Sequence, residues 1–234
     1  MRPRGSTMGQ IIILCCIKRH EHQLQPPTYI LETSTAMSTT NTDTPRTLTL
    51  KPIVMFPQIV LGLNIVRPFP DPAFHWFLFV ANPMSIQGEG TKLHVTDSKN
   101  GVWEFEVVTN FTINSSSEAI TTALIIGEIP EGKLKDLTGL IDICEHQIKL
   151  NEVPAADKGK EPKFTCRVWM KEAVRCLNAA GYLRCTDVDE LEKEAIARGC
   201  AALEEIDDID ALDIPRSQKR FVAKLHKSKV SHTV

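Results

Sequence analysis

The sequence predicts an α+β protein in which a small antiparallel sheet is followed by packed helices. Short apolar or alternating runs recur between residues 59 and 129, bounded by Pro, Gly or Asn, which is typical of strands joined by turns. From residue 134 onward, apolar residues instead recur every three or four positions, as they do along one face of a helix. The change of period divides the predicted domain into a sheet half and a helical half.

Five strands are expected in the sheet half. The proline-rich segment 68–72 separates the first two, and Lys99-Asn100-Gly101 is a hairpin turn ahead of the fourth. The fourth strand alternates apolar and acidic residues from Trp103, as a half-exposed strand does. The five strands cover residues 59–66, 74–81, 91–96, 102–108 and 122–129.

Three helices are expected after the sheet. The first spans residues 134–148. The second has the clearest apolar face; it begins at Cys166 and ends at Gly181, since glycine suits the position after a helix. Thr186 or Asp187 is placed to cap the third helix.

The two ends of the chain differ in composition from this folded segment, which we place at residues 51–200. Residues 1–50 are rich in Thr, Ser, Pro and Gln and are predicted to be disordered, because they bury too little apolar surface to offset the entropy of ordering. Met37 is an alternative start of the protein within this segment. Residues 201–234 turn acidic and then basic, which is typical of a charged, solvated tail.

Composition restricts the class of protein. A net charge of −2 gives no overall field that would favour nucleic acid or an anionic membrane. The nearest approach to a membrane span is the apolar run Ile11–Ile17, far short of the roughly 18 residues required. The seven cysteines include no CxxC pair and suit a reducing compartment, so we expect a cytoplasmic protein without a transmembrane segment or a cofactor.

Three residues in a fixed order carry the candidate chemistry. His75 lies in the second predicted strand, His94 in the third, and Cys166 opens the strongest helix. Backbone N–H groups at a helix start favour a thiolate, and a neighbouring imidazole can take the thiol proton and return it to a leaving group. A second polar side chain must hold that imidazole in one tautomer. The pattern therefore predicts Cys166 as nucleophile, His75 as base and His94 as the orienting residue.

The same landmarks resemble those of the circularly permuted papain-like superfamily. His75-Trp76, then Leu93-His94-Val95, then the run from Phe164 to Trp169 appear in that superfamily's order, with the histidine strands before the cysteine helix. Its members include lecithin:retinol acyltransferase-like proteins, cell-wall amidases and permuted papain deubiquitinase-like peptidases. A group of fungal proteins shares these landmarks and also the segment Gly101–Glu106. The resemblance implies a permuted papain-like fold and the same three catalytic roles.

The favoured hypothesis is thus a cysteine-dependent hydrolase or acyltransferase acting on an amide, ester or thioester of a small molecule, lipid or peptide. The nucleophile motif of the acyltransferase branch, Asn-Cys-Glu-His, is replaced here by Thr165-Cys166-Arg167-Val168, so the branch stays open. The alternative is a non-catalytic binding domain of the same fold, with the charged tail as its contact surface. Zinc chemistry would accept His75, His94 and Cys166 as ligands, but their spacing is not that of a zinc site, and no metal is expected.

Overall fold

The computed structural model describes residues 54–67, 70–85, 88–97, 100–113, 120–134, 137–210 and 224–234. These residues belong to one compact unit of the chain. The segment predicted to be disordered, residues 1–50, lies outside the described residues, as does the alternative start at Met37.

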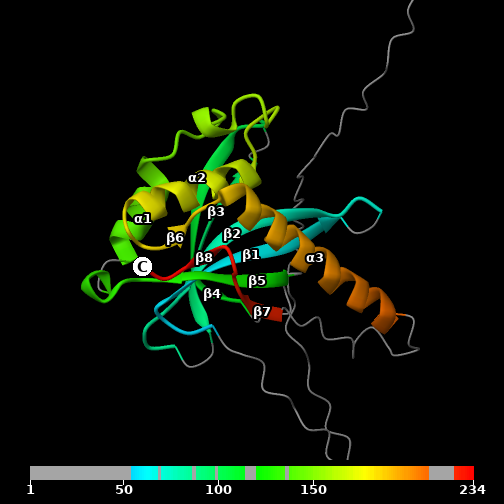
Figure 1. Ribbon diagram of the computed structural model, residues 1–234, viewed down its shortest axis with the longest axis horizontal. Coiled ribbons are helices and arrows are strands. Elements are labelled where there is room, and N and C mark those ends of the chain that lie inside the picture. The colour runs from blue at the N-terminus through cyan, green and yellow to red at the C-terminus, as the bar shows by residue number, and fades with distance from the viewer. Residues whose placement is uncertain are drawn as a thin grey trace, which may run out of the picture. The chain divides into compact units, whose positions relative to one another are not determined.

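A six-stranded sheet forms the centre of this unit (Figure 1), with the strand order β4-β3-β2-β1-β5-β7. Neighbouring strands are antiparallel from β4 to β5, whereas β7 runs parallel to β5. The five antiparallel strands confirm the predicted set, and the sheet as a whole is mixed. Its strands are β1 (Gln58–Arg67), β2 (Ala73–Ala81), β3 (Glu89–Asp97), β4 (Trp103–Thr112), β5 (Ile120–Glu128) and β7 (Lys224–Lys227).

Helices α1 (Leu137–His146), α2 (Cys166–Ala179) and α3 (Val188–Asp210) follow the antiparallel strands in the chain, which confirms the α+β class. Short 3-10 turns, η1 (Glu131–Lys133) and η2 (Ala155–Asp157), lie in the connections. None of the helices in the described part of the chain combines the length and the apolar character needed to cross a membrane.

The helices cover one face of the sheet, where the larger core lies. Alternate residues of β2, such as Trp76 and Leu78, pack there against α2 side chains, including Trp169. The intervening residues of β2, Phe77 and Phe79, join a smaller apolar cluster on the opposite face. Burial on both faces accounts for the almost continuous apolar sequence of this strand.

The ends of α2 and α3 follow from local chemistry. Thr165 precedes α2 in an extended conformation, and its Oγ1 accepts a hydrogen bond from Val168 N at 3.3 Å. Gly181 has a φ of 72° and follows the helix, while Tyr182 N donates back to Leu177 O at 2.9 Å. Asp187 caps α3 by accepting from two backbone N–H groups through its Oδ1. These contacts confirm the predicted start and stop of α2 and the cap of α3.

The C-terminal residues depart from the expected tail. α3 continues to Asp210, beyond residue 200 where the folded segment was predicted to end, and the last residues add β7 to the main sheet. β8 (Ser231–His232) pairs with β6 (Arg184–Cys185) in a second, two-stranded sheet. Charge composition misses these strands because β7 and β8 are short and rich in Lys, His and Ser, residues that are common on solvated surfaces.

Candidate functional site

The two predicted histidines are in direct contact. His75 Nε2 lies 2.7 Å from His94 Nδ1, and the two rings meet edge to face. Both residues are buried. The ladder between β2 and β3 covers Leu78–Ala81 and Gly90–Leu93, so the histidines lie where this pairing has ended. Two residues that are 19 positions apart in the sequence are thus joined by one hydrogen bond.

The environment of His94 keeps it neutral. Burial lowers the pKa of His94 to about 3, and electrostatic interactions with Lys92 and His75 act in the same direction. The imidazole accordingly holds a single ring proton at neutral pH. The Glu106 carboxylate, on the neighbouring strand β4, lies 3.4 Å from His94 Nε2.

Cys166 is the first residue of α2, as predicted, and its side chain is buried. It lines a pocket of about 410 Å³ together with Trp76 and Trp103. The size suits a small molecule or a side-chain-sized part of a larger one. Besides these three residues, the wall consists of Arg67, Asp71, Pro72, Ala73, Phe74, Thr165, Arg167 and Ile196.

The two arginines that line the pocket have different partners. Arg167 bridges Glu161 and Glu192, two buried carboxylates. Arg67, which is exposed, donates from Nε to the backbone carbonyl of Asp71 at 2.8 Å. The positive charge next to Cys166 is therefore held in place by acidic partners, whereas Arg67 and Asp71 are exposed to solvent.

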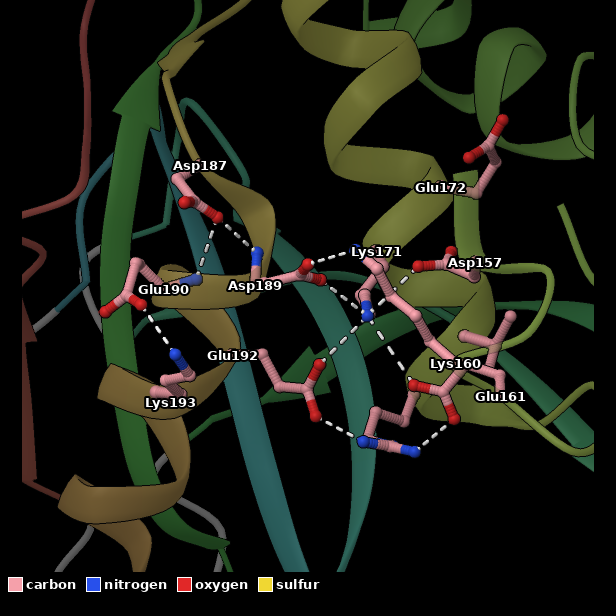
Figure 2. A network of polar contacts seen from close by, with 12 residues as sticks. Asp157, Lys160, Glu161, Lys171, Glu172, Asp187, Asp189, Glu190, Glu192 and Lys193 are labelled. Carbon is pink, nitrogen blue, oxygen red and sulfur yellow. Dashed lines mark hydrogen bonds and ion pairs between the residues drawn. The ribbon is translucent and has the colours of Figure 1, made fainter. Parts of the chain in front are cut away.

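The acidic partners of Arg167 belong to a larger network that holds α2 (Figure 2). Lys171, one turn after Arg167, is buried, and its Nζ lies between 2.7 and 3.5 Å from four carboxylates. Arg175, a turn further, makes a bidentate pair with the fully buried Asp157. The four carboxylates around Lys171 are those of Asp157, Glu161, Asp189 and Glu192, from η2, the loop after it and α3. The network thus fixes the cysteine-bearing helix against its neighbours.

The structure brings His75 and His94 together, and Cys166 lines the same pocket as Phe74 and Trp76, the residues on either side of His75. Strict alternation along β2 would direct the His75 side chain to the face opposite Trp76. β2 stays in regular register with β1 through His75 and Phe74, so this alternation holds at His75.

Three further polar groups at the site escaped the sequence analysis. Glu106 alternates with apolar residues in β4 and gave only the signal of an exposed strand face. Arg167 and Lys171 occupy the polar stripe of α2, where basic residues are ordinarily solvated. The spacing of four between them, with acidic residues in the preceding loop and in α3, was the available signal of a shared ion network.

No cluster of three His, Cys, Asp or Glu side chains able to hold a metal ion occurs in the part of the chain that the structure describes.

The fold and site define an α+β protein with a paired-histidine strand region and a cysteine at the start of a helix beside a pocket. The chain belongs to the family of unknown function DUF6540, whose model matches residues 63–184. The match runs from β1 through α2 and includes both histidines and Cys166. Neither the curated proteins nor the solved structures contain a match to the chain.

Proposed function

We propose that this protein is a cysteine-dependent hydrolase or acyltransferase of permuted papain-like architecture, acting on an amide, ester or thioester. The supporting observation is the 2.7 Å contact between His75 Nε2 and His94 Nδ1, together with Cys166 at a helix start beside the neighbours of His75. Papain-like catalysis needs an imidazole oriented through one ring nitrogen, so that the other can exchange a proton with the thiol.

In the proposed reaction, Cys166 Sγ transfers its proton to His75 and attacks the acyl carbon, forming a C–S bond. His75 then gives that proton to the departing amine, alcohol or thiol as its bond to the acyl carbon breaks. Water or another acceptor attacks the acyl-enzyme, loses a proton to His75 and releases Cys166. Backbone N–H groups in the first turn of α2 supply the positive field for the oxyanion.

The pocket provides room for the acyl part of such a substrate. Trp76 and Trp103 give it apolar walls, while Arg67, Asp71 and Arg167 supply charge. A pocket of about 410 Å³ with few polar groups is of the kind that binds a small organic ligand. Only the acyl end of the substrate therefore has to enter the pocket, whether that substrate is a small molecule, a lipid or a peptide.

The test of this proposal is the pH dependence of Cys166 alkylation by iodoacetamide, read by mass spectrometry, in the wild type and in His75→Ala. An activated pair gives a thiolate that titrates well below about pH 8 and shifts upward in His75→Ala. Cys176→Ser, on the same helix, is the matched control and leaves the Cys166 profile unchanged. Slow alkylation of Cys166 with the same pH profile in wild type and His75→Ala would remove the basis of the proposal. Retained hydrolase activity in Cys166→Ser would do the same.

A non-catalytic binding domain is the second candidate, and two observations favour it. The Cys166 side chain is only 3% exposed, and strict strand alternation would turn His75 away from it. Under this alternative, Cys166 packs as a small apolar residue. Under this alternative, Cys166→Ala does not change the pH dependence of alkylation of the other cysteines. It also does not change any rise in Tm that a bound ligand produces.

A further inference from the structure

The hydrogen bond between His75 and His94 leaves open which ring donates. A neutral imidazole carries one N–H and one lone pair, so the 2.7 Å contact fixes a donor and an acceptor only after one ring proton has been located. Because His94 stays neutral in its buried environment, its second ring nitrogen, Nε2, decides the matter. If Nε2 carries the proton, Nδ1 must accept from His75; if not, Nδ1 donates to it.

The group that faces His94 Nε2 is the carboxylate of Glu106. Glu106 is the direct partner of His94 in the ladder between β3 and β4, so both side chains lie on the same face of the sheet. Oε2 of Glu106 is 3.4 Å from His94 Nε2, which is within ion-pair distance, and this buried nitrogen makes no hydrogen bond in the structure. The glutamate side chain is 44% exposed, so its carboxylate keeps contact with water while facing the buried ring.

A carboxylate can only accept a hydrogen bond, and a lone pair pointed at it is repelled. From this geometry we infer that Glu106 is a positioning residue that holds the His94 ring proton on Nε2. Lys92, whose charge also acts on His94, offers donors only and cannot take this role.

The position of the ring proton on His94 also determines the tautomer of His75. With its proton on Nε2, His94 accepts at Nδ1, so the bridging proton belongs to His75 Nε2. His75 then carries its lone pair on Nδ1, the basic nitrogen that a thiol proton requires. This consequence rests on the proposed function, whereas the two tautomers themselves do not. A carboxylate on β4 that faces His94 Nε2 thus sets the direction of the hydrogen bond between the rings on β2 and β3.

The test is long-range ¹H–¹⁵N NMR of the histidine rings in the full-length protein at neutral pH, with His75→Gln and His94→Gln for assignment. Wild-type protein is expected to show a protonated Nε2 and an unprotonated Nδ1 in both rings. Glu106→Ala is expected to lose this single form and give mixed tautomers in His94 and His75. Glu106→Gln, whose amide oxygen can still accept, is expected to retain much of it.

Glu104→Ala is the matched control, because Glu104 lies on the same strand and face as Glu106 but two residues away, where it pairs with Thr96 and not with His94. It is expected to leave both rings unchanged, and circular dichroism verifies that each variant is folded. Protonated Nδ1 in wild-type His94, or identical ring spectra in wild type and Glu106→Ala, would overturn the inference.

Activity separates this inference from the proposed function. If Cys166 is activated by His75, Glu106→Ala lowers its alkylation rate near neutral pH by at least about tenfold, since a base in the wrong tautomer cannot take the proton. If Cys166 is an ordinary thiol, Glu106→Ala still changes the ring spectra of the two histidines. The inference about Glu106 then holds without the proposed function. An activated Cys166 with unaltered tautomers in Glu106→Ala would leave the enzyme proposal intact and remove Glu106 from it.

Discussion

At the scale of single residues, Lys171 shows how a buried charge can be retained. The ammonium group gives up its hydration but gains hydrogen bonds to Asp157, Asp189 and Glu192, which together raise the pKa of Lys171 above its usual value. Its partners in turn benefit, since hydrogen bonds from Lys171 and Arg175 lower the pKa of Asp157 despite burial. Each group is tolerated in the interior only because the others are charged.

Removing Lys171 should therefore cost more than a typical ion pair. In Lys171→Met, four carboxylates lose their shared cation, and the expected loss of unfolding free energy is about 3 kcal/mol. The low end of the range for buried pairs is expected, because Asp157 keeps Arg175 and Asp189 keeps Lys160. Urea denaturation followed by circular dichroism measures the change.

Lys193→Met provides the comparison for that measurement. Lys193 is 71% exposed and pairs only with Glu190, three residues away on the same helix. Exposed pairs of this kind contribute far less to stability than buried ones, because water and salt screen them. Equal losses in the two variants would mean that the buried network holds no more than a surface pair does.

At the scale of elements, the strands of the sheet are the part that sequence patterns predict best. β1 to β5 arise where predicted because turns and apolar periods are local signals, and the caps of α2 and α3 are local for the same reason. The contact between His75 and His94 needed the pairing of β2 with β3, and the place of Glu106 needed the register of β4. Register depends on the hydrophobic pattern of both strands and on the turn between them, and the register shift between Gly90 and Lys92 is not visible in the sequence of either strand alone.

Two glycines show how closely these strands approach other groups. A Cβ on Gly62 would lie 2.0 Å from Cζ of Phe77, a side chain, whereas a Cβ on Gly90 would lie 2.2 Å from the carbonyl oxygen of Val80, part of the backbone. A side chain can rotate away from such an overlap, but a paired strand cannot move without breaking its ladder. Gly90 is therefore the less replaceable of the two.

Gly90→Ala is expected to lower the unfolding free energy by about 1–3 kcal/mol, the range for overpacking, and by more than Gly62→Ala. Gly132→Ala is the neutral reference, because a Cβ there meets nothing within 4 Å. Thermal unfolding of the three variants ranks them. A Gly90→Ala protein as stable as Gly132→Ala would show that the β2–β3 ladder is looser than the structure has it.

At the scale of the whole described unit, the C-terminal residues close the structure instead of trailing from it. β7 continues the sheet beyond β5, and Ser228 N donates to Ile125 O at 2.9 Å. Ser231 Oγ donates to Ile126 O at 2.6 Å, and Glu194 of α3 accepts from Ser228 Oγ. The contacts with β5 join residues 103 and 105 positions apart and the contact with Glu194 joins residues 34 apart, so no local pattern could have predicted them.

Truncation after Asp210 should consequently destabilise the sheet rather than remove a solvated tail. Each of the hydrogen bonds lost at Ser228 and Ser231 is worth about 1 kcal/mol net. The truncation also removes β7, the neighbour of β5, and β8, the partner of β6. A loss of at least about 3 kcal/mol corresponds to a fall in Tm of roughly 6–12 °C for a domain of this size. A chain ending at His232, which lacks only two exposed residues, is the control and should keep the wild-type Tm. If both truncations melt at the wild-type temperature, β7 and β8 contribute nothing to stability, and the last residues are the dispensable tail that their charge pattern alone predicts.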